Sequence, residues 1–227
     1  MDPALASLVA ANLSFAGTHI ALSHPLRAPL VKLLGVKGFL GLYSLLAFAA
    51  LGWIIVAFRR VGPGGASLWN GQSDLVWIVA SVLTVIALAL VIGANRGNPA
   101  AVGQPAEAAA SAQAAGVFAV TRHPMMWGFA IWAVSHVLVA PNARTLVTAG
   151  TMGLLGLIGS HLQDRKKEVL LGQAWKDWEA RTSFVPRLGK LAGIGLPLWL
   201  GAFALWLLVT WLHLWLAYVP AGIWRWL

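Results

Sequence analysis

The amino-acid sequence predicts an all-α, polytopic transmembrane helical bundle of about six spans with an amphipathic cytoplasmic surface helix. Hydrophobic residues make up 59% of the 227 residues and charged residues only 10%, with a mean hydropathy of +0.76. A soluble globular domain carries about 25% charged residues, so this class is excluded. Six apolar runs approach the roughly 20 residues that a spanning helix needs. They are residues 4–23, 38–58, 74–94, 124–140, 143–162 and 196–219, and they form one domain over residues 1–227.

The runs and the segments between them follow in order along the chain. No basic residue precedes the first run, so we expect a retained span and not a cleaved signal. The fourth run is short and is followed at once by the fifth, which predicts a hairpin turned by Pro141-Asn142. Residues 59–73 are rich in glycine and turn formers, so no regular structure is expected there. Residues 99–115 are Ala-rich and of low complexity, and indicate a mobile loop or a weak helix.

Residues 163–182 differ from the spans and predict the amphipathic surface helix. Leu171, Trp175 and Trp178 recur at i, i+4 and i+7, while charged residues occupy much of the remaining surface. Two interpretations stay open at this point. The helix is either an anchor with a tryptophan edge at the membrane surface, or a lid over a site that faces the cytoplasm.

The distribution of basic residues predicts the orientation of the bundle. Twelve Lys and Arg residues fall after the first, third and fifth runs, and four fall on the other side. Basic residues gather in cytoplasmic loops, so we expect an integral membrane protein with both termini outside. The net charge of +9 has the same origin, and no nucleic-acid partner is expected. The chain has no cysteine, which excludes disulfides and thiolate chemistry within it.

Histidines inside a span are costly and are therefore candidate functional residues. His19 lies toward the cytoplasmic end of the first run, and His136 lies well inside the fourth. Each is either a neutral histidine bonded to a backbone carbonyl or a ligand of a metal or heme. His24 and His213 are expected to be interfacial, and His161 to bond a loop carbonyl or to be functional.

The tripeptide Arg122-His123-Pro124 marks the start of the fourth run. Proline suits the first helical turn, and a helix N-terminus beside an arginine attracts anions. A ligand carboxylate, a phosphate or a cofactor tail is therefore expected there. Further along, Asp164 and Glu168 pair with Arg122 or Arg165, or are solvated.

Thr121 to Met125, followed by Gly128, Trp132 and His136, resembles the NnrU family. That family is associated with nitrite and nitric oxide reduction in denitrifying bacteria, so the resemblance implies the bacterial inner (cytoplasmic) membrane. The family is also similar to plant and cyanobacterial 15-cis-zeta-carotene isomerase. The resemblance extends over most of residues 15–190. Its other matching segments are Gly17-Thr18-His19 with Arg27, residues 41–44, Asp164-Arg165, Gly172, and Arg181 to Pro186.

The resemblance implies a heme b held by His19 and His136. Arg122 and His123 are expected to form a separate cofactor-binding site at the helix start, suited to an anion or a cofactor tail. It implies a redox-type cis–trans isomerase of a hydrophobic polyene or another small molecule in the lipid bilayer. An accessory role in nitrite and nitric oxide reduction is the other activity it implies. A non-catalytic component that helps a membrane reductase partner to assemble is a further alternative. Ala133 stands where the isomerase has a cysteine, so a thiolate ligand is excluded.

A second resemblance points to another cofactor. Arg122-His123-Pro124, followed by Glu168 and by Pro186-Arg187, is similar to isoprenylcysteine and phospholipid methyltransferases. In those enzymes the His-Pro motif and a C-terminal helix with a glutamate bind S-adenosylmethionine. Both elements fall on the predicted cytoplasmic side. S-adenosylmethionine is therefore the alternative cofactor.

Overall fold

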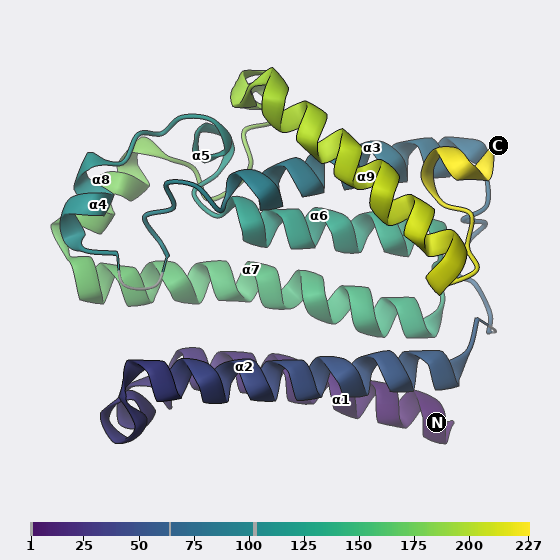
Figure 1. The fold of residues 1–227 in the computed structure, drawn as a ribbon, viewed down its shortest axis with the longest axis horizontal. Helices are drawn as coiled ribbons and strands as arrows, with labels where there is room; N and C mark the ends of the chain where they lie inside the picture. Colours follow the sequence, from purple (N-terminus) through teal and green to yellow (C-terminus); the bar gives the residue numbers. More distant parts are fainter. Residues whose placement is uncertain (1, 64, 102–103) are drawn as a thin grey trace.

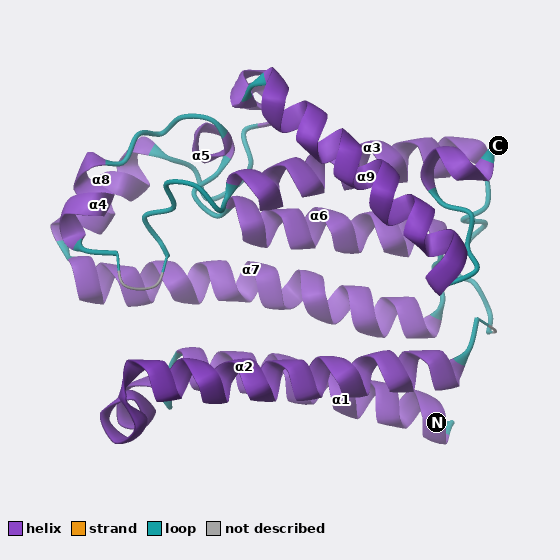
Figure 2. Ribbon diagram, in the orientation of Figure 1, coloured by secondary structure: helices purple, strands orange, loops and turns teal. Residues whose placement is uncertain are grey.

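The computed structural model describes residues 2–63, 65–101 and 104–227, and all the regular structure in these ranges is helical (Figures 1 and 2). The long helices are α1 (Pro3–Ser23), α2 (Arg27–Val61), α3 (Asp74–Gly93), α6 (Pro124–Val139), α7 (Ala143–Leu171) and α9 (Leu196–Leu216). The short ones are α4 (Ala106–Ser111), α5 (Val117–Val120), α8 (Gln173–Arg181) and the 3-10 helices η1 (Leu188–Ile194) and η2 (Gly222–Arg225).

The predicted helical membrane bundle is confirmed. Five helices, α1, α2, α3, α7 and α9, are long and apolar enough to cross a membrane. The sixth expected span is the shorter α6, whose 16 residues reach about 24 Å at 1.5 Å per residue, against a hydrocarbon core of about 30 Å. Both termini lie at the same end of the bundle (Figure 1), which we call the terminus end. The opposite end carries α4 and α8, and we call it the α8 end.

The loop before α3 donates hydrogen bonds to the last carbonyls of the short helix α6 at the terminus end. The last carbonyls of a helix have no partners within it. Here Trp69 donates its indole N–H to the carbonyl of Leu138 at 3.0 Å, and the Gln72 amide donates to Val139 at 3.2 Å. The expectation of no regular structure in this loop is confirmed for its described residues after Val61. An irregular loop therefore satisfies the polar end of a helix that is too short to reach the membrane surface.

Two helices are longer than the apolar runs that predicted them. α2 begins at Arg27, with a bend at Gly35, whose φ of 69° is left-handed and accessible to glycine at little cost. α7 does not end at residue 162 but continues to Leu171. The expected surface helix 163–182 is therefore two pieces, because the helix breaks only at Gly172, where φ is 56°. The separate helix α8 spans only its second half.

Small residues set the distances between α3, α6 and α7. A Cβ added at Gly128 of α6 would lie 2.6 Å from the Val91 side chain of α3. A Cβ added at Gly153 of α7 would lie 3.0 Å from Ala133 of α6. Gly128 and Ala133 therefore lie where α6 comes closest to α3 and α7. Such contacts replace the hydrophobic driving force that helices lack in lipid.

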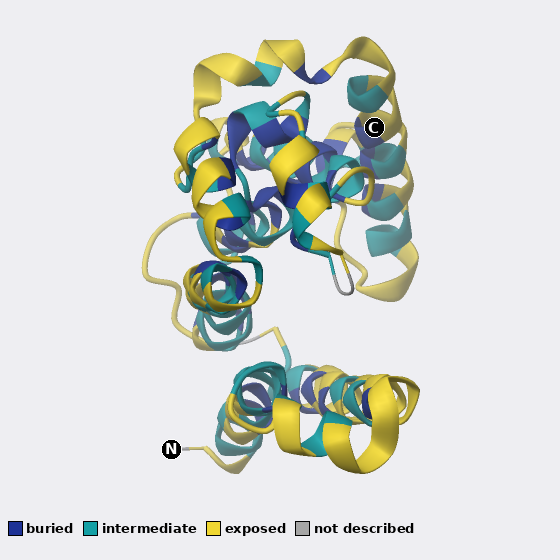
Figure 3. Cartoon of the chain, turned by 90° about the vertical axis from the view of Figure 1, so that its left-hand side faces the viewer, coloured by how far each residue is buried: buried dark blue, intermediate teal, exposed yellow. Residues whose placement is uncertain are grey.

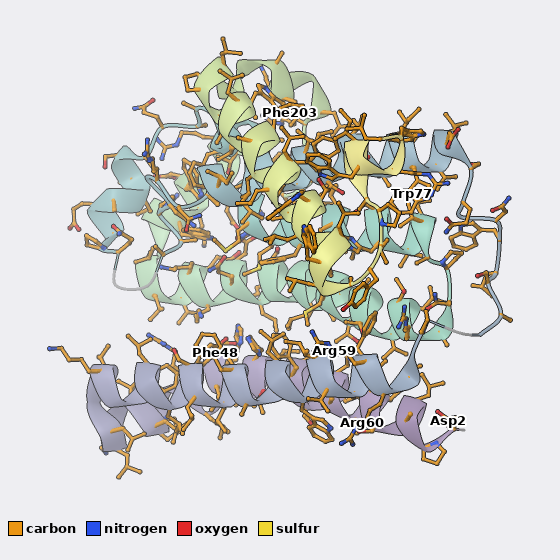
Figure 4. All side chains as sticks on the ribbon, turned by 45° about the vertical axis from the view of Figure 1, so that its right-hand side comes forward. Asp2, Phe48, Arg59, Arg60, Trp77 and Phe203 are labelled. Atoms are coloured by element: carbon orange, nitrogen blue, oxygen red, sulfur yellow. The ribbon has the colours of Figure 1, made fainter. Side chains whose placement is uncertain are left out.

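The helices α1 and α2 form a pair beside this central group (Figure 3). Their buried residues Leu8 and Ile54 pack with Val147 and Met152 of α7, so the pair joins the bundle through α7. Arg59 and Arg60, in the last turn of α2, lie toward the end that holds Asp2 (Figure 4). They belong to the smaller of the two groups of basic residues.

Gly156→Ala should destabilise the bundle by about 1–3 kcal/mol, the usual cost of overpacking. The added Cβ would lie 2.9 Å from the backbone oxygen of Met126 in α6, which cannot move without shifting that helix. Gly150→Ala and Gly159→Ala are matched controls on α7, because nothing lies within 4 Å of a Cβ at either position. Thermal unfolding in detergent measures all three. Equal losses in the three variants would contradict close α6–α7 packing.

Candidate functional site

A buried ion network joins the start of α6 to α7 at the α8 end. The Arg122 guanidinium donates to one Asp164 oxygen through Nε at 2.9 Å and Nη2 at 2.7 Å. His123 lies 2.8 Å through Nε2 from the other oxygen of Asp164. Because that carboxylate has no proton to give, Nε2 of His123 must carry one. One carboxylate on α7 therefore holds two successive side chains of the α6 N-terminus.

The segment after α8 clamps the backbone of this network. The Arg122 N–H donates to the Ser183 carbonyl at 2.8 Å, and the Thr121 hydroxyl donates to the Phe184 carbonyl at 2.7 Å. The Phe184 ring lies 5.5 Å from the Arg122 guanidinium carbon and 5.5 Å from the His123 ring. An arginine over an aromatic face is attracted by the ring quadrupole. Residues 120–123 are thus fixed from both sides.

Helix α8 covers the network and brings a second carboxylate to it. Glu179 lies 3.4 Å from Nη2 of Arg122. Burial, together with the neighbouring Asp164 and Glu168 carboxylates, raises the pKa of Glu179, and the Arg122 charge only partly offsets this. Trp175 and Trp178 have no exposed surface. The interpretation of this helix as an anchor with a tryptophan edge is therefore wrong, since both indoles lie in the protein core, while the lid interpretation agrees with the position of Glu179.

A cavity of about 320 Å³ opens beside the network. Its lining carries three carboxylates, two guanidinium groups and one imidazole. The lining residues are Arg122, His161, Asp164, Arg165, Glu168, Glu179 and Phe184. His161, for which a bond to a loop carbonyl and a functional role were both left open, lies in the cavity wall. Such a lining suits a small polar ligand that carries both charges.

The network changes the expected role of Arg122 and His123. Arg122 was expected to attract an external anion, but Asp164 of the same chain already occupies its guanidinium fork. The second expected pairing is also present, with Arg165 lying 3.2 Å from Glu168. His123 is 3% exposed and is not in the cavity wall. Of the two residues, only Arg122 reaches the cavity.

His19 lies on α1 against α2. Its Nδ1 donates to the Phe15 carbonyl at 2.8 Å, and its ring centre lies 5.3 Å from that of Tyr43 on α2. The backbone-bonded alternative thus describes how His19 is held. Because Nδ1 carries the proton, the neutral ring presents a free lone pair at Nε2.

His136 lies on α6 toward the terminus end. Its Nδ1 donates to the Trp132 carbonyl at 2.9 Å, and the Trp132 ring lies 4.3 Å from the imidazole, centre to centre. The Ser135 hydroxyl is 3.2 Å from the same nitrogen and 3.1 Å from the Thr84 hydroxyl of α3. These contacts orient the ring and leave its Nε2 as a lone pair, which is how metal-ligating imidazoles are held.

The structure does not bring His19 and His136 together. Lys166 of α7 reaches the carbonyl of Ser23, so the end of α1 lies at the α8 end. Gly153 of α7 faces Ala133, one turn before His136, at a level much nearer the terminus end. Counting residues along α7 separates the two imidazoles by roughly 15–20 Å at 1.5 Å per residue. One iron between both rings does not fit this arrangement.

His213 is a residue that the sequence reasoning placed only at the interface. Its ring centre lies 6.4 Å from that of His136, and its Nδ1 donates to the Val209 carbonyl at 2.6 Å. The sequence held only a weak signal for this contact. His213 and His136 each lie near the outer end of their own apolar run. Among the described residues, no group of three or more His, Cys, Asp or Glu could hold a metal ion.

Asp164→Asn should destabilise the protein by about 3–5 kcal/mol, because it removes the charged partner of the buried Arg122 at 2.7 Å and leaves only the longer Glu179 contact at 3.4 Å. The control is Glu168→Gln on the same helix, whose partner Arg165 has a side chain that is 66% exposed. An exposed pair contributes at most about 1 kcal/mol. Thermal unfolding in detergent compares the two variants. A similar loss in both would show that the buried network does not hold α6 to α7.

Comparison with known proteins places these features in one family. The NnrU protein family matches residues 7–221. A curated relative, the chloroplastic 15-cis-zeta-carotene isomerase of Arabidopsis thaliana, is 27% identical over 162 residues. That alignment covers 68% of this chain and 42% of the relative, so the chain matches less than half of the relative's length. No solved structure matches.

The family match runs from α1 to the segment before η2 and includes the whole ion network and both His19 and His136. A match over most of the chain, on a helical bundle with five membrane-crossing helices, agrees with the motif at the start of α6. The chain therefore belongs to the NnrU family and is an integral membrane protein.

Proposed function

We propose that this protein is a membrane isomerase that converts a lipid-soluble polyene between cis and trans forms, as the name of its relative describes. The observation that carries the proposal is His136. It is a half-buried imidazole in an apolar helix, oriented by Trp132 and Ser135, with an unused lone pair at Nε2. Ionisable groups at this depth are retained for function, because they are costly in lipid.

The proposed cofactor is heme, and His136 is the proposed ligand of the heme iron. Bound there, a heme would supply an electron-accepting iron beside a lipid-soluble substrate. The chain itself orients the His136 ring, fixes its tautomer, and surrounds it with apolar helices. His19 is left out of this site, because it lies far toward the α8 end.

The proposal includes the orientation of the protein in the membrane. The α8 end, where Lys166 and Lys167 lie, faces the cytoplasm of a bacterial cell, and both termini lie outside. The polyene then reaches the protein from the bilayer. An accessory role beside a nitrite or nitric oxide reductase is the competing role, and co-purification with such a reductase from a colourless preparation would favour it.

The test is a dark isomerisation assay on purified protein in lipid nanodiscs, with 15-cis-zeta-carotene followed by chromatography. The wild type should produce the trans isomer only when the cofactor is bound, and His136→Ala should lower the rate to background. His24→Ala is the control, because His24 bonds Ser23 at the opposite end of the bundle. A wild-type rate in His136→Ala, or no isomerisation by the loaded wild type, would contradict the proposal.

The cavity at the α8 end favours a second candidate function, S-adenosylmethionine-dependent methylation. Its volume of about 320 Å³ lies at the low end of the range for small-molecule sites. The carboxylates and guanidinium groups of the lining can pair with the amino, sulfonium and carboxylate groups of that cofactor. Glu168 lies in the wall, where the methyltransferase resemblance places its cofactor-binding glutamate.

Calorimetric titration of S-adenosylmethionine tests this second candidate. If the cavity holds the cofactor, Glu168→Ala should weaken binding at least about tenfold, equivalent to 1.4 kcal/mol. Glu107→Ala is the control, because Glu107 lies in α4 outside the cavity. A wild-type protein that shows no binding heat at millimolar cofactor would remove the methyltransferase candidate.

A further inference from the structure

Three basic side chains from two helices gather where α1 turns into α2 at the α8 end. Arg27 begins α2, and Lys166 and Lys167 lie near the end of α7. The Lys166 ammonium reaches the carbonyl of Ser23, the last residue of α1, at 3.4 Å. The positive charge of Arg27 acts on both lysines, so the three groups are near neighbours that repel one another. We call Arg27, Lys166 and Lys167 the basic cluster.

The basic cluster has no counter-charge in the described part of the chain. The two carboxylates of α7, Asp164 and Glu168, pair with other cations, and no ion pair between described residues includes a member of the cluster. Lys167 is only 6% exposed, and its ammonium has a neutral partner, the Ala101 carbonyl at 3.1 Å. A buried ammonium without a counter-charge is costly, so an anion from outside the chain would stabilise the cluster.

The donors of the cluster suit a phosphate. The guanidinium hydrogen bonds between described residues involve other arginines, so the N–H donors of Arg27 are available. The Arg27 guanidinium carbon lies 5.2 Å from the ring centre of Phe39, which holds the group in place by its flat face. A guanidinium can then bind two phosphate oxygens in parallel along its edge, while a lysine ammonium adds a compact charge.

The start of α2 places the basic cluster at the level of a membrane surface. The bend at Gly35 separates the first turns of α2 from the rest of the helix, and these turns run across the end of the α1–α2 pair (Figure 1). Leu26, Leu33 and Leu34 are exposed there. Exposed leucines on a short helical segment with basic residues are typical of a helix that lies in the membrane interface. The anion site therefore borders an apolar surface that suits acyl chains.

We propose that the basic cluster binds the phosphate of an anionic phospholipid at the membrane surface of the α8 end, with the acyl chains along Leu33 and Leu34. Arg27 and Lys166 donate to the phosphate oxygens, and the buried Lys167 adds positive charge behind them. Basic pockets between transmembrane helices at the membrane surface bind anionic headgroups in this way. The inference goes beyond the proposed function and does not depend on it.

The bound lipid would fasten the α1–α2 pair to the rest of the bundle. Leu8 and Ile54 join this pair to α7 through apolar contacts nearer the terminus end. At the α8 end, one phosphate held by Arg27 of the pair and Lys166 of α7 supplies a second link. Because a ligand that binds only the folded state stabilises it, the anionic lipid should raise the unfolding temperature.

The experiment measures lipid binding to the full chain in detergent by native mass spectrometry, with dioleoyl phosphatidylglycerol compared with the zwitterionic dioleoyl phosphatidylcholine. The wild type should prefer the anionic lipid by about tenfold or more, and the double variant Arg27→Gln/Lys166→Gln should lose this preference. Arg59→Gln/Arg60→Gln is the matched control and should keep it. This control removes two exposed cations from the opposite end of the same helix (Figure 4).

Folding and the source of the phosphate are tested separately. Each variant must elute from gel filtration as the wild type does, and if the double variant does not, Lys166→Gln takes its place. Lys166→Arg keeps the charge and should keep the preference. Equal binding of both lipids by the wild type, or equal losses in the two double variants, would overturn the inference. Millimolar inorganic phosphate that displaces all the phosphatidylglycerol would assign the site to a free anion and would also overturn it.

Discussion

The buried charge of Asp164 is the constraint on which the rest of the α8 end depends. A carboxylate that is 5% exposed in an apolar bundle is stable only if cations and N–H donors surround it. Arg122 and His123 meet this need, and they can do so only if α6 starts next to the last turns of α7. The same pairing explains why α7 continues past its apolar run. The polar residues after 162 have partners inside the protein and do not need a separate surface helix.

This constraint divides the molecule into two chemically different ends. At the α8 end, opposed charges are paired, clamped by residues 182–187 and covered by α8, so the remaining cavity is polar. At the terminus end, α6 and α9 carry two imidazoles, His136 and His213, whose Nδ1 atoms each donate to a backbone carbonyl. Paired charges around a polar cavity suit a soluble, charged ligand. The two groups of candidate residues that the sequence suggested, Arg122-His123 and His136, therefore lie at opposite ends of the bundle and not in one site.

The helices were predictable because a bilayer demands long apolar runs, and composition alone reveals them. The ion pairs were partly predictable, since the chain has only seven Asp and Glu residues and few of them can meet Arg122. The burial of Trp175 and Trp178 was not, because an amphipathic helix shows the same pattern whether its apolar side faces lipid or the core. The approach of His213 to His136 was not predictable either. It depends on the tilt of α9, and no local pattern encodes that tilt.

The short length of α6 connects these points. Its 16 residues cannot span the hydrocarbon core, so its polar ends fall where the protein must satisfy them. At its start, Asp164 and the segment after α8 supply the partners. At its end, Trp69 and Gln72 bind the last carbonyls. A longer helix would place His136 near the middle of a span, with only apolar neighbours. In the short helix α6, His136 lies within one turn of the helix end. α9 also ends there, so His213 lies next to His136.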